Sequence, residues 1–186
     1  MKLQSTDIRK VFKFNMNKDM NPFWNMDALL KEDRYVLDFD VYLPSKGMNL
    51  QRPLCWTLMQ KQQLILSIIK ENPIPKISVI QQTFSRDANG QKDKVVYEII
   101  DGKQRLNAIM DFLKNKFAVE VKETLYFFSD LDEILQCDLN RYSPRGDVAY
   151  SYYDNPIPDN EKIAWFEQIN FTGTPQDEQH LKNLLK

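Results

Sequence analysis

The sequence predicts an α+β fold, and three observations indicate it. Short apolar segments of the kind that form strands occur between longer segments whose apolar residues recur every three or four positions, as in amphipathic helices. Two of the strand segments flank a polar loop that contains Asn89-Gly90, a common hairpin turn. Helical periodicity dominates the C-terminal part. With 186 residues, of which 42% are hydrophobic, the chain can form one domain with a sizeable core.

The first 33 residues are predicted to be an N-terminal arm or a short helical extension, and residues 34–186 to be the folded domain. The arm is polar and rich in Met and Asn, and Asp27–Leu30 indicates a helical turn. Its aromatic side chains can dock on the core, although a loosely held arm fits the composition equally well. These aromatic residues are Phe12, Phe14, Phe23 and Trp24.

The segment Tyr35–Leu43 alternates between apolar and polar residues, which predicts a half-buried strand. Pro44–Gly47 then turns the chain. Pro53 favours an extended backbone at Arg52, so the arginine can point into a cleft while Trp56 holds the loop against the core. The alternative is a surface Arg52 that packs on Trp56.

A helix and a β-hairpin are predicted next. Thr57 and Gln60 form a capping box at the start of a helix that carries an apolar stripe and ends before Pro73. Residues 76–84 and 94–100 are predicted strands. Because a polar loop with a hairpin turn joins them, the two strands should pair antiparallel.

The second strand of this hairpin leads into the run Asp101-Gly102-Lys103-Gln104-Arg105, and a predicted helix over residues 103–113 follows. A helix start collects unpaired backbone N–H groups and partial positive charge, so it suits a phosphate or another anion. Two cationic side chains and an amide strengthen this interpretation. The alternative is that Asp101 caps the helix and that the basic side chains are solvated.

The rest of the chain is predicted to contain three more strands and three more helices. The strands span residues 117–121, 125–128 and 148–153, and the helices span residues 129–139, 159–170 and 176–185. The run Ser129-Asp130-Leu131-Asp132-Glu133 is the predicted capped start of the first of these helices. The loop Asn170–Pro175, between the last two, is dense in small hydroxyl and amide groups.

The composition excludes several kinds of site. A net charge of −1 gives no overall attraction to nucleic acid or to an anionic membrane. Cys55 and Cys137 lie far apart without histidine neighbours, so neither a zinc site nor a disulfide framework is expected, and a reducing compartment is indicated. His180 is the single histidine, which excludes a histidine-based triad. With no apolar run near ~20 residues and no signal peptide, a soluble cytoplasmic protein is expected.

Known nucleotide-binding and hydrolase motifs, including the P-loop and the zinc-binding HExxH pattern, are absent. The run from Asp101 to Arg105 instead resembles the DGQQR motif, which marks the N-terminal domain of GmrSD-type, modification-dependent restriction endonucleases. Three further segments resemble this family in the same order along the chain. They are Gln51-Arg52-Pro53 with Trp56, residues 68–77 and residues 166–175.

The resemblance implies a ParB/sulfiredoxin-like domain with a small mixed sheet that binds a nucleoside triphosphate and, in several family members, hydrolyses it. In these systems the nucleotide step drives DNA cleavage by a separate nuclease domain, so DNA and a nuclease subunit are implied partners. Carried over by position, the catalytic residues are Asp101, Gln104 and Arg105, and Asp101 is also a candidate Mg²⁺ ligand. The implied nucleotide- and phosphate-binding residues are Gly102, Lys103, Arg52, Gln51, Asn170, Thr172 and Thr174.

Two departures from the family pattern matter. Lys103 stands where the motif has its first Gln, which adds positive charge and leaves turnover open. The chain also ends soon after residues 166–175, and one histidine is too few for an HNH nuclease site, so autonomous nuclease activity is not expected. Two other functions stay open. One is a non-catalytic nucleotide- or DNA-binding module that acts as a regulator or decoy in a defence or phage context, and the other is a ParB-like DNase.

Overall fold

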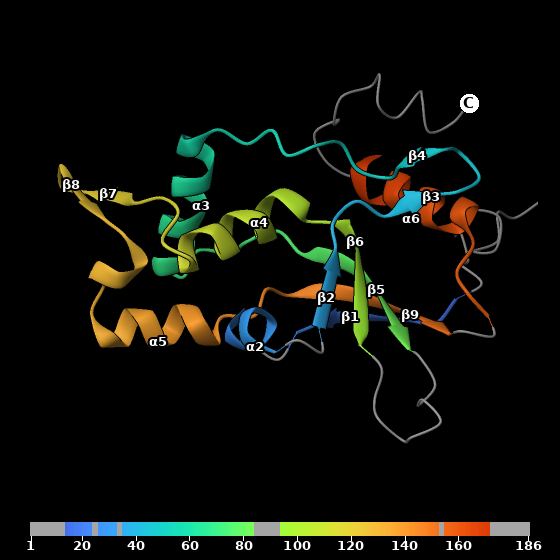
Figure 1. The fold of residues 1–186 in the computed structure, drawn as a ribbon, viewed down its shortest axis with the longest axis horizontal. Helices are drawn as coiled ribbons and strands as arrows, with labels where there is room; N and C mark the ends of the chain where they lie inside the picture. Colours follow the sequence, from blue (N-terminus) through green and yellow to red (C-terminus); the bar gives the residue numbers. More distant parts are fainter. Residues whose placement is uncertain (1–13, 24–25, 33–34, 84–93, 153–154, 172–186) are drawn as a thin grey trace, which may run out of the picture.

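A five-stranded mixed sheet forms the centre of the molecule (Figure 1). The computed structural model describes residues 14–23, 26–32, 35–83, 94–152 and 155–171. The strands of the sheet are β1 (Met16–Met20), β2 (Tyr35–Asp38), β5 (Ile77–Thr83), β6 (Val95–Asp101) and β9 (Gly146–Tyr152). Their order is β1-β9-β5-β6-β2, with β1/β9 and β5/β6 antiparallel and β9/β5 and β6/β2 parallel. The predicted α+β class and mixed sheet are therefore confirmed.

The described residues also form five α-helices and two short ladders of paired strands. The helices are α2 (Met26–Lys31), α3 (Leu58–Ile69), α4 (Lys103–Leu113), α5 (Glu133–Arg141) and α6 (Asp159–Phe171). The ladders pair β3 (Tyr42–Leu43) with β4 (Met48–Asn49), and β7 (Val119–Val121) with β8 (Thr124–Tyr126). No helix among these residues is long and apolar enough to cross a membrane. The helix predicted over residues 176–185 lies outside the described residues.

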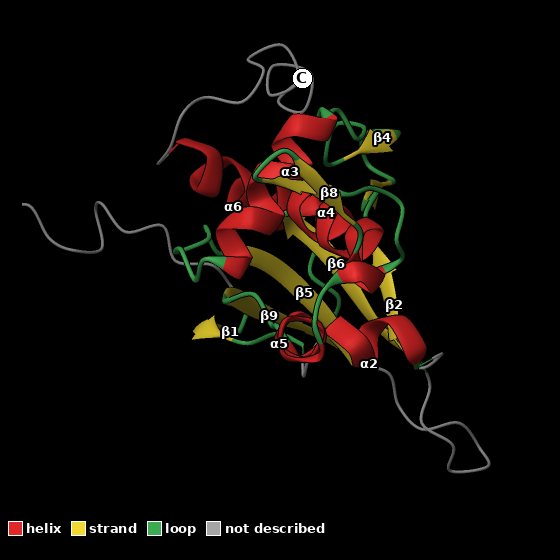
Figure 2. Ribbon diagram, turned by 90° about the vertical axis from the view of Figure 1, so that its left-hand side faces the viewer, coloured by secondary structure: helices red, strands yellow, loops and turns green. Residues whose placement is uncertain are grey.

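The two faces of the sheet have different partners. In β6, Tyr97 and Ile99 belong to a core built with α2, α3, α4 and α5, whereas Ile100 belongs to a second core built with α6 and the β3–β4 ladder. This division follows from the two-residue period of a strand. Figure 1 shows α3, α4 and α5 on one side of the molecule and α6 with the ladder on the other. Figure 2 shows that α3, α4 and α6 gather towards one end of the sheet.

Several predictions about the middle of the chain are confirmed. The capping box starts α3, because the Gln60 N–H donates to Thr57 Oγ1 at 3.3 Å and the Thr57 N–H donates to Gln60 Oε1 at 2.9 Å. The predicted hairpin is the antiparallel pair β5–β6, and its Asn89-Gly90 turn lies outside the described residues. The helix predicted over residues 103–113 is α4.

Residues 35–43 do not form the single strand that their alternation predicted. β2 ends at Asp38, because the Asp38 carboxylate accepts hydrogen bonds from the N–H groups of Asp40 and Val41, both at 3.0 Å. Such a side-chain bond to nearby backbone competes with the sheet. Val41 adopts a positive φ of 44° in this turn. The apolar residues after the turn, Val41 and Leu43, are buried in the second core instead.

The capped helix start predicted within residues 129–133 lies at Asp132. A 3-10 helix, Phe128–Asp130, comes first, and the Asp130 carboxylate accepts a hydrogen bond from the Phe127 N–H at 2.8 Å. Asp132 then caps α5 by accepting a hydrogen bond from the Leu135 N–H at 2.8 Å. Asp130 and Asp132 thus each accept a hydrogen bond from a free backbone N–H, and Asp132 starts the α-helix. The predicted helix start is confirmed.

Part of the N-terminal segment belongs to the sheet. β1 pairs antiparallel with β9, and α2 lies where the helical turn was predicted. Phe23 is buried, and Phe14 packs against Trp165 with ring centroids 5.5 Å apart, so both phenylalanines dock on the core. Phe12 and Trp24 lie outside the described residues. Because β1 is exposed over most of its length, it carries no apolar pattern from which a strand could be predicted.

Candidate functional site

A cleft of about 480 Å³ lies where α3, α4 and α6 approach one another. Small-molecule sites have volumes of roughly 300–1,000 Å³, so the cleft can hold such a ligand. Eight of the ten predicted site residues line it: Gln51, Arg52, Asp101, Gly102, Lys103, Gln104, Arg105 and Asn170. Thr172 and Thr174 lie outside the described residues. The lining is completed by Trp56, Leu64, Pro75, Lys76 and Ile169, of which the sequence patterns singled out Trp56 alone.

Gly102 is the N-cap of α4, and its position requires glycine. Its φ is 101°, a conformation that residues with a side chain rarely adopt. A Cβ atom at this position would lie 2.5 Å from Ile77 Cγ2, so β5 passes directly against the turn. The N-cap is Gly102 and no described side chain caps the helix, so the alternative that Asp101 is the cap is wrong. The first turn of α4 offers backbone N–H groups at the cleft wall, which suit an anion.

Asp101 and Arg105 form an ion pair in the wall of the cleft. Arg105 Nη2 lies 2.6 Å from Asp101 Oδ2, and Arg105 Nη1 donates to the Pro75 carbonyl oxygen at 3.0 Å. The pair spans one helical turn, so the arginine points back towards the helix start. Burial raises the pKa of Tyr142, and the charge of Arg105 partly offsets that rise. In this state the carboxylate and the guanidinium neutralise each other.

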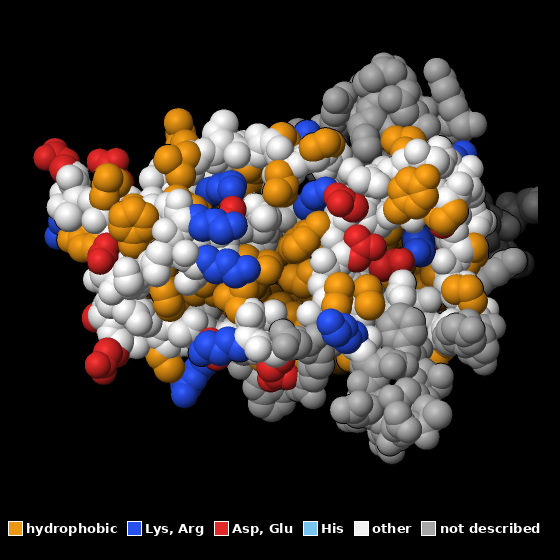
Figure 3. Space-filling view, viewed as in Figure 1, with side chains coloured by type: hydrophobic (Ala, Val, Ile, Leu, Met, Phe, Trp, Pro, Cys, Tyr) orange, Lys and Arg blue, Asp and Glu red, His pale blue; other side chains and the backbone are white. Residues whose placement is uncertain are grey.

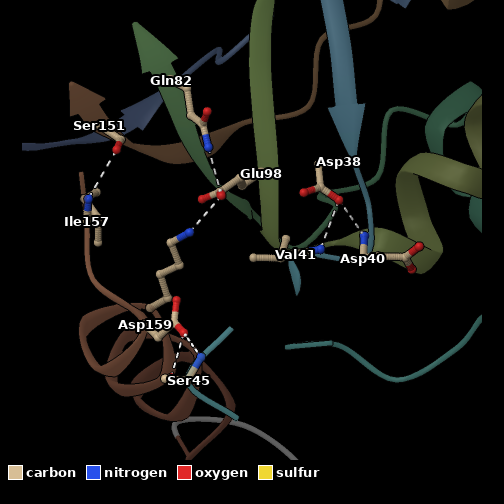
Figure 4. A network of polar contacts seen from close by, with 10 residues as sticks. Asp38, Asp40, Val41, Ser45, Gln82, Glu98, Ser151, Ile157 and Asp159 are labelled. Carbon is tan, nitrogen blue, oxygen red and sulfur yellow. Dashed lines mark hydrogen bonds and ion pairs between the residues drawn. The ribbon is translucent and has the colours of Figure 1, made fainter. Parts of the chain in front are cut away.

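Lys103 is buried beside Asp40. The side chain of Lys103 is 6% exposed, and its Nζ lies 2.9 Å from Asp40 Oδ1. The alternative that the basic side chains here are solvated is therefore wrong for Lys103. Asp40 reaches it because of the turn that the Asp38 carboxylate holds (Figure 4). The helix dipole disfavours a cation in the first turn, and Asp40 supplies the opposite charge. Since the sequence pattern placed Asp40 within a continuous strand, it could not predict this contact.

Four cationic residues among those that the structure describes line the cleft, and three of them have a carboxylate partner. Besides Lys103 and Arg105, Lys76 has its Nζ 3.2 Å from Asp19 Oδ1. Arg52 is half-buried and forms no hydrogen bond or ion pair within the part of the chain that the structure describes. Basic and acidic side chains adjoin over the start of α4 on the face shown in Figure 3. Among the described cations of the lining, Arg52 is therefore the one without a carboxylate that competes with an incoming anion.

Gln104 holds the loop that faces α4. Its Oε1 accepts hydrogen bonds from the N–H groups of Cys55 and Trp56, at 3.1 and 3.3 Å. Its Nε2 donates to the Pro53 carbonyl oxygen at 3.0 Å. Trp56 in turn packs against the first core, which confirms that it holds the loop against the core. No sequence pattern indicated these backbone contacts, because they join segments about fifty residues apart.

Gln51 and Asn170 also bond to backbone at the edge of the cleft. The Gln51 amide donates to the Ile99 carbonyl oxygen of β6. Asn170 Nδ2 donates to the Phe166 carbonyl oxygen at 2.7 Å, one turn earlier in α6. Both side chains are nearly buried. These residues thus shape the cleft wall through the backbone that they hold, in addition to any contact with a ligand.

A comparison with known families identifies the domain that carries this cleft. The family model described as GmrSD restriction endonuclease, N-terminal domain, matches residues 41–186, a span that includes every predicted site residue. The chain belongs to the GmrSD N-terminal domain family. No curated protein and no solved structure matches the chain. The resemblance drawn from the four sequence segments is therefore confirmed by the family match.

In this GmrSD N-terminal domain, the DGQQR-like run forms the cleft wall from the end of β6 into α4. No group of three or more His, Cys, Asp or Glu side chains is placed to hold a metal ion in the described ranges. Asp101 is the one carboxylate among the described residues of the lining. Mg²⁺ is commonly held by one or two carboxylates together with substrate phosphates and water, so Asp101 fits a Mg²⁺ that arrives with a nucleotide.

Proposed function

We propose that this GmrSD-type N-terminal domain binds a nucleoside triphosphate in the cleft and hydrolyses it in the cytoplasm, as the nucleotide-dependent part of a restriction or phage-defence system. Cleavage of DNA would then belong to a separate nuclease subunit. The observation that carries the proposal is the convergence of eight motif-derived residues on one cleft of ligand size. The mixed sheet that ends in a strand–turn–helix also supports a ParB/sulfiredoxin-like fold.

The proposal places the triphosphate at the start of α4. The N–H groups and partial positive charge of the uncapped first turn attract phosphate oxygens. Arg52 adds a guanidinium from the facing loop, and a guanidinium can bind phosphate through two parallel hydrogen bonds. Because Arg52 has no other partner among the described residues, phosphate binding does not compete with any ion pair that the structure describes for Arg52. Trp56, Leu64 and Ile169 give the cleft an apolar side that suits a planar base.

Turnover requires the Asp101–Arg105 pair to separate. In the structure Arg105 contacts the Asp101 carboxylate at 2.6 Å, so neither group is free to act on a phosphate. A triphosphate beside Arg105 offers the guanidinium a second anion, and Asp101 is then free to orient a water molecule or to bind Mg²⁺. When bound, Mg²⁺ neutralises charge on the phosphate oxygens. The protein's own contribution comes from Arg52 and Arg105, which stabilise the negative charge that develops during phosphoryl transfer.

Calorimetry with Mg²⁺ and ATP or GTP, followed by a phosphate-release assay, tests the proposal. We expect Arg52→Ala to weaken nucleotide binding by about tenfold or more, since a charge-assisted contact is lost. Its folding stability should not change, because Arg52 has no described partner. We expect Arg105→Ala to abolish phosphate release. Arg141→Ala is the matched control, because Arg141 is exposed in α5 and does not line the cleft. If wild type binds no nucleoside triphosphate at high micromolar concentration, the proposal fails.

The second candidate is a non-catalytic nucleotide- or DNA-binding module. The observation that favours it is the closed Asp101–Arg105 pair together with Lys103 in place of the motif's first Gln. Nucleotide binding without any phosphate release would select this function. Metal-dependent cleavage of plasmid DNA by the chain alone would instead select a ParB-like nuclease. Both measurements use the same purified protein as the calorimetry.

A further inference from the structure

The loop of residues 51–56 brings Arg52 and Trp56 to the cleft, although it forms neither helix nor strand. Such a segment needs contacts from elsewhere in order to keep one conformation. Gln104 supplies three of them, because its side-chain oxygen accepts two backbone N–H groups and its nitrogen donates to one carbonyl oxygen. An amide has one oxygen and two N–H donors, so most of the bonding capacity of Gln104 is used by the loop.

We propose that Gln104 is a positioning residue, which holds the 51–56 loop so that Arg52 reaches the phosphates and Trp56 reaches the base of the bound nucleotide. This inference rests on the proposed function for the identity of the ligand. The motif implies that Gln104 acts directly on the reacting phosphate. The proposal gives Gln104 a different role, because its side chain would act through the loop. Gln51 fixes the other end of the same loop through the Ile99 carbonyl oxygen. Arg52 therefore lies between two tethered points of the backbone.

The effect of this arrangement on affinity is one of preorganisation. A loop that is already held in its binding conformation loses little conformational entropy when the ligand arrives. Without the Gln104 amide, three backbone groups turn to water and the loop samples other conformations, although Arg52 and Trp56 are still present. We expect nucleotide affinity to fall about tenfold. The fold should persist, because Gln104 belongs to neither apolar core.

Hydrogen exchange measured by mass spectrometry tests the tether without any ligand. We expect Gln104→Ala to raise the exchange rates of the Cys55 and Trp56 amides by about tenfold, because each loses its acceptor. Gln62→Ala is the matched control, since Gln62 Nε2 donates to the Ala118 carbonyl oxygen at 2.8 Å and does not line the cleft. It should leave both amides unchanged. Unaltered exchange at Cys55 and Trp56 in Gln104→Ala overturns the proposal.

Calorimetry with Mg²⁺ and ATP or GTP then separates positioning from direct contact. If Gln104 acts through Arg52, the double variant Arg52→Ala/Gln104→Ala loses less affinity than the product of the two single losses. Losses that multiply fully would show that Gln104 contacts the nucleotide independently, and the proposal would be wrong. If wild type binds no nucleotide, the proposed function fails, and the exchange measurement still decides whether Gln104 holds the loop.

Discussion

Strand β6 carries two carboxylates, Glu98 and Asp101, and each forms a short ion pair with a basic residue on a helix. Glu98 Oε1 lies 2.7 Å from Lys162 Nζ of α6, and Asp101 Oδ2 lies 2.6 Å from Arg105 Nη2 of α4. The side chains of the first pair are 8% and 11% exposed, and those of the second are 16% and 13% exposed. Of the two pairs, the second lines the cleft. The first joins α6 to the sheet, whereas a ligand can compete for the second.

The surroundings of Glu98 show what the first pair does. Gln82 Nε2 donates to Glu98 Oε1 at 2.9 Å (Figure 4), and Glu98 Oε2 is buried without a hydrogen-bond partner among the described residues. These polar groups lie on the face of the sheet that α6 covers with apolar side chains. A charge in such a place is costly unless its partner is present. The two ion pairs on this strand have similar chemistry but different roles. The Glu98–Lys162 pair is enclosed by packing and holds α6 to the sheet, whereas the Asp101–Arg105 pair is open to the cleft.

Removal of Lys162 has the largest expected effect on this comparison. Lys162→Met leaves Glu98 buried without its opposite charge, and we expect the free energy of unfolding to fall by about 3–5 kcal/mol. Urea denaturation followed by circular dichroism measures this loss. The double variant Glu98→Leu/Lys162→Met should recover most of it, because both charges are gone. A single variant as stable as wild type would show that the enclosed pair is not structural.

Gly102→Ala disturbs the cleft pair without removing either charge. The added Cβ meets Ile77 Cγ2 at 2.5 Å in a residue whose φ is 101°, and we expect a loss of about 2–4 kcal/mol in unfolding free energy. Gly47→Ala is the control, because Gly47 has a φ of 65° and no atom of the described residues lies within 4 Å of its added Cβ. The control should lose only about 1 kcal/mol, since it bears the backbone strain alone. Equal losses in the two variants would mean that the contact with Ile77 carries no cost.

The elements around the cleft could be predicted because their signals are local. An apolar strand, a sharp turn at Gly102 and a helical stripe follow one another directly, and the capping box of α3 lies within four residues. The resemblance of four separate segments to one family then predicted which residues meet. Eight of them do line one cleft. The sequence thus predicted which residues line the cleft better than it predicted the hydrogen bonds and ion pairs among them.

The hydrogen bonds and ion pairs inside the site could not be predicted, because they depend on polar side chains that bond to backbone groups. Some of these groups lie two or three residues away and others lie far away along the chain. The Asp38 carboxylate ends β2 and moves Asp40 onto Lys103, against the alternating pattern of the segment. Gln104 bonds to a loop about fifty residues away, and no periodicity records such a contact. The edge strand β1 is mostly exposed, so its sequence has no alternating apolar pattern from which a strand could be predicted. The Asp38 turn is a local side-chain contact that overrides the strand pattern, whereas the other two cases are decided by tertiary structure.

Asp111, at the far end of α4, extends the comparison to a carboxylate that has two basic partners and does not line the cleft. Its oxygens lie 2.9 Å from Lys61 Nζ and 2.8 Å from Lys116 Nζ. Burial raises the pKa of Asp111, but hydrogen bonds and charge from Lys116 and Lys61 outweigh it, and the net pKa lies below the ordinary 3.8. A lowered pKa in the folded state means that ionised Asp111 stabilises the fold above pH 3.8. This stability is lost as the pH falls through the folded-state pKa.

Asp111→Asn removes that contribution and has the smallest expected effect. We expect the variant to be less stable than wild type at neutral pH by about 1 kcal/mol, because the Lys116 side chain is well exposed and water screens its charge. The difference should narrow as the pH is lowered through and below 3.8, which urea midpoints at successive pH values measure. A difference that stays constant over this range would mean that the two lysines do not act through the charge of Asp111. Nucleotide affinity should not change, since this group of charges, like Glu98 and Lys162, lies away from the cleft lining.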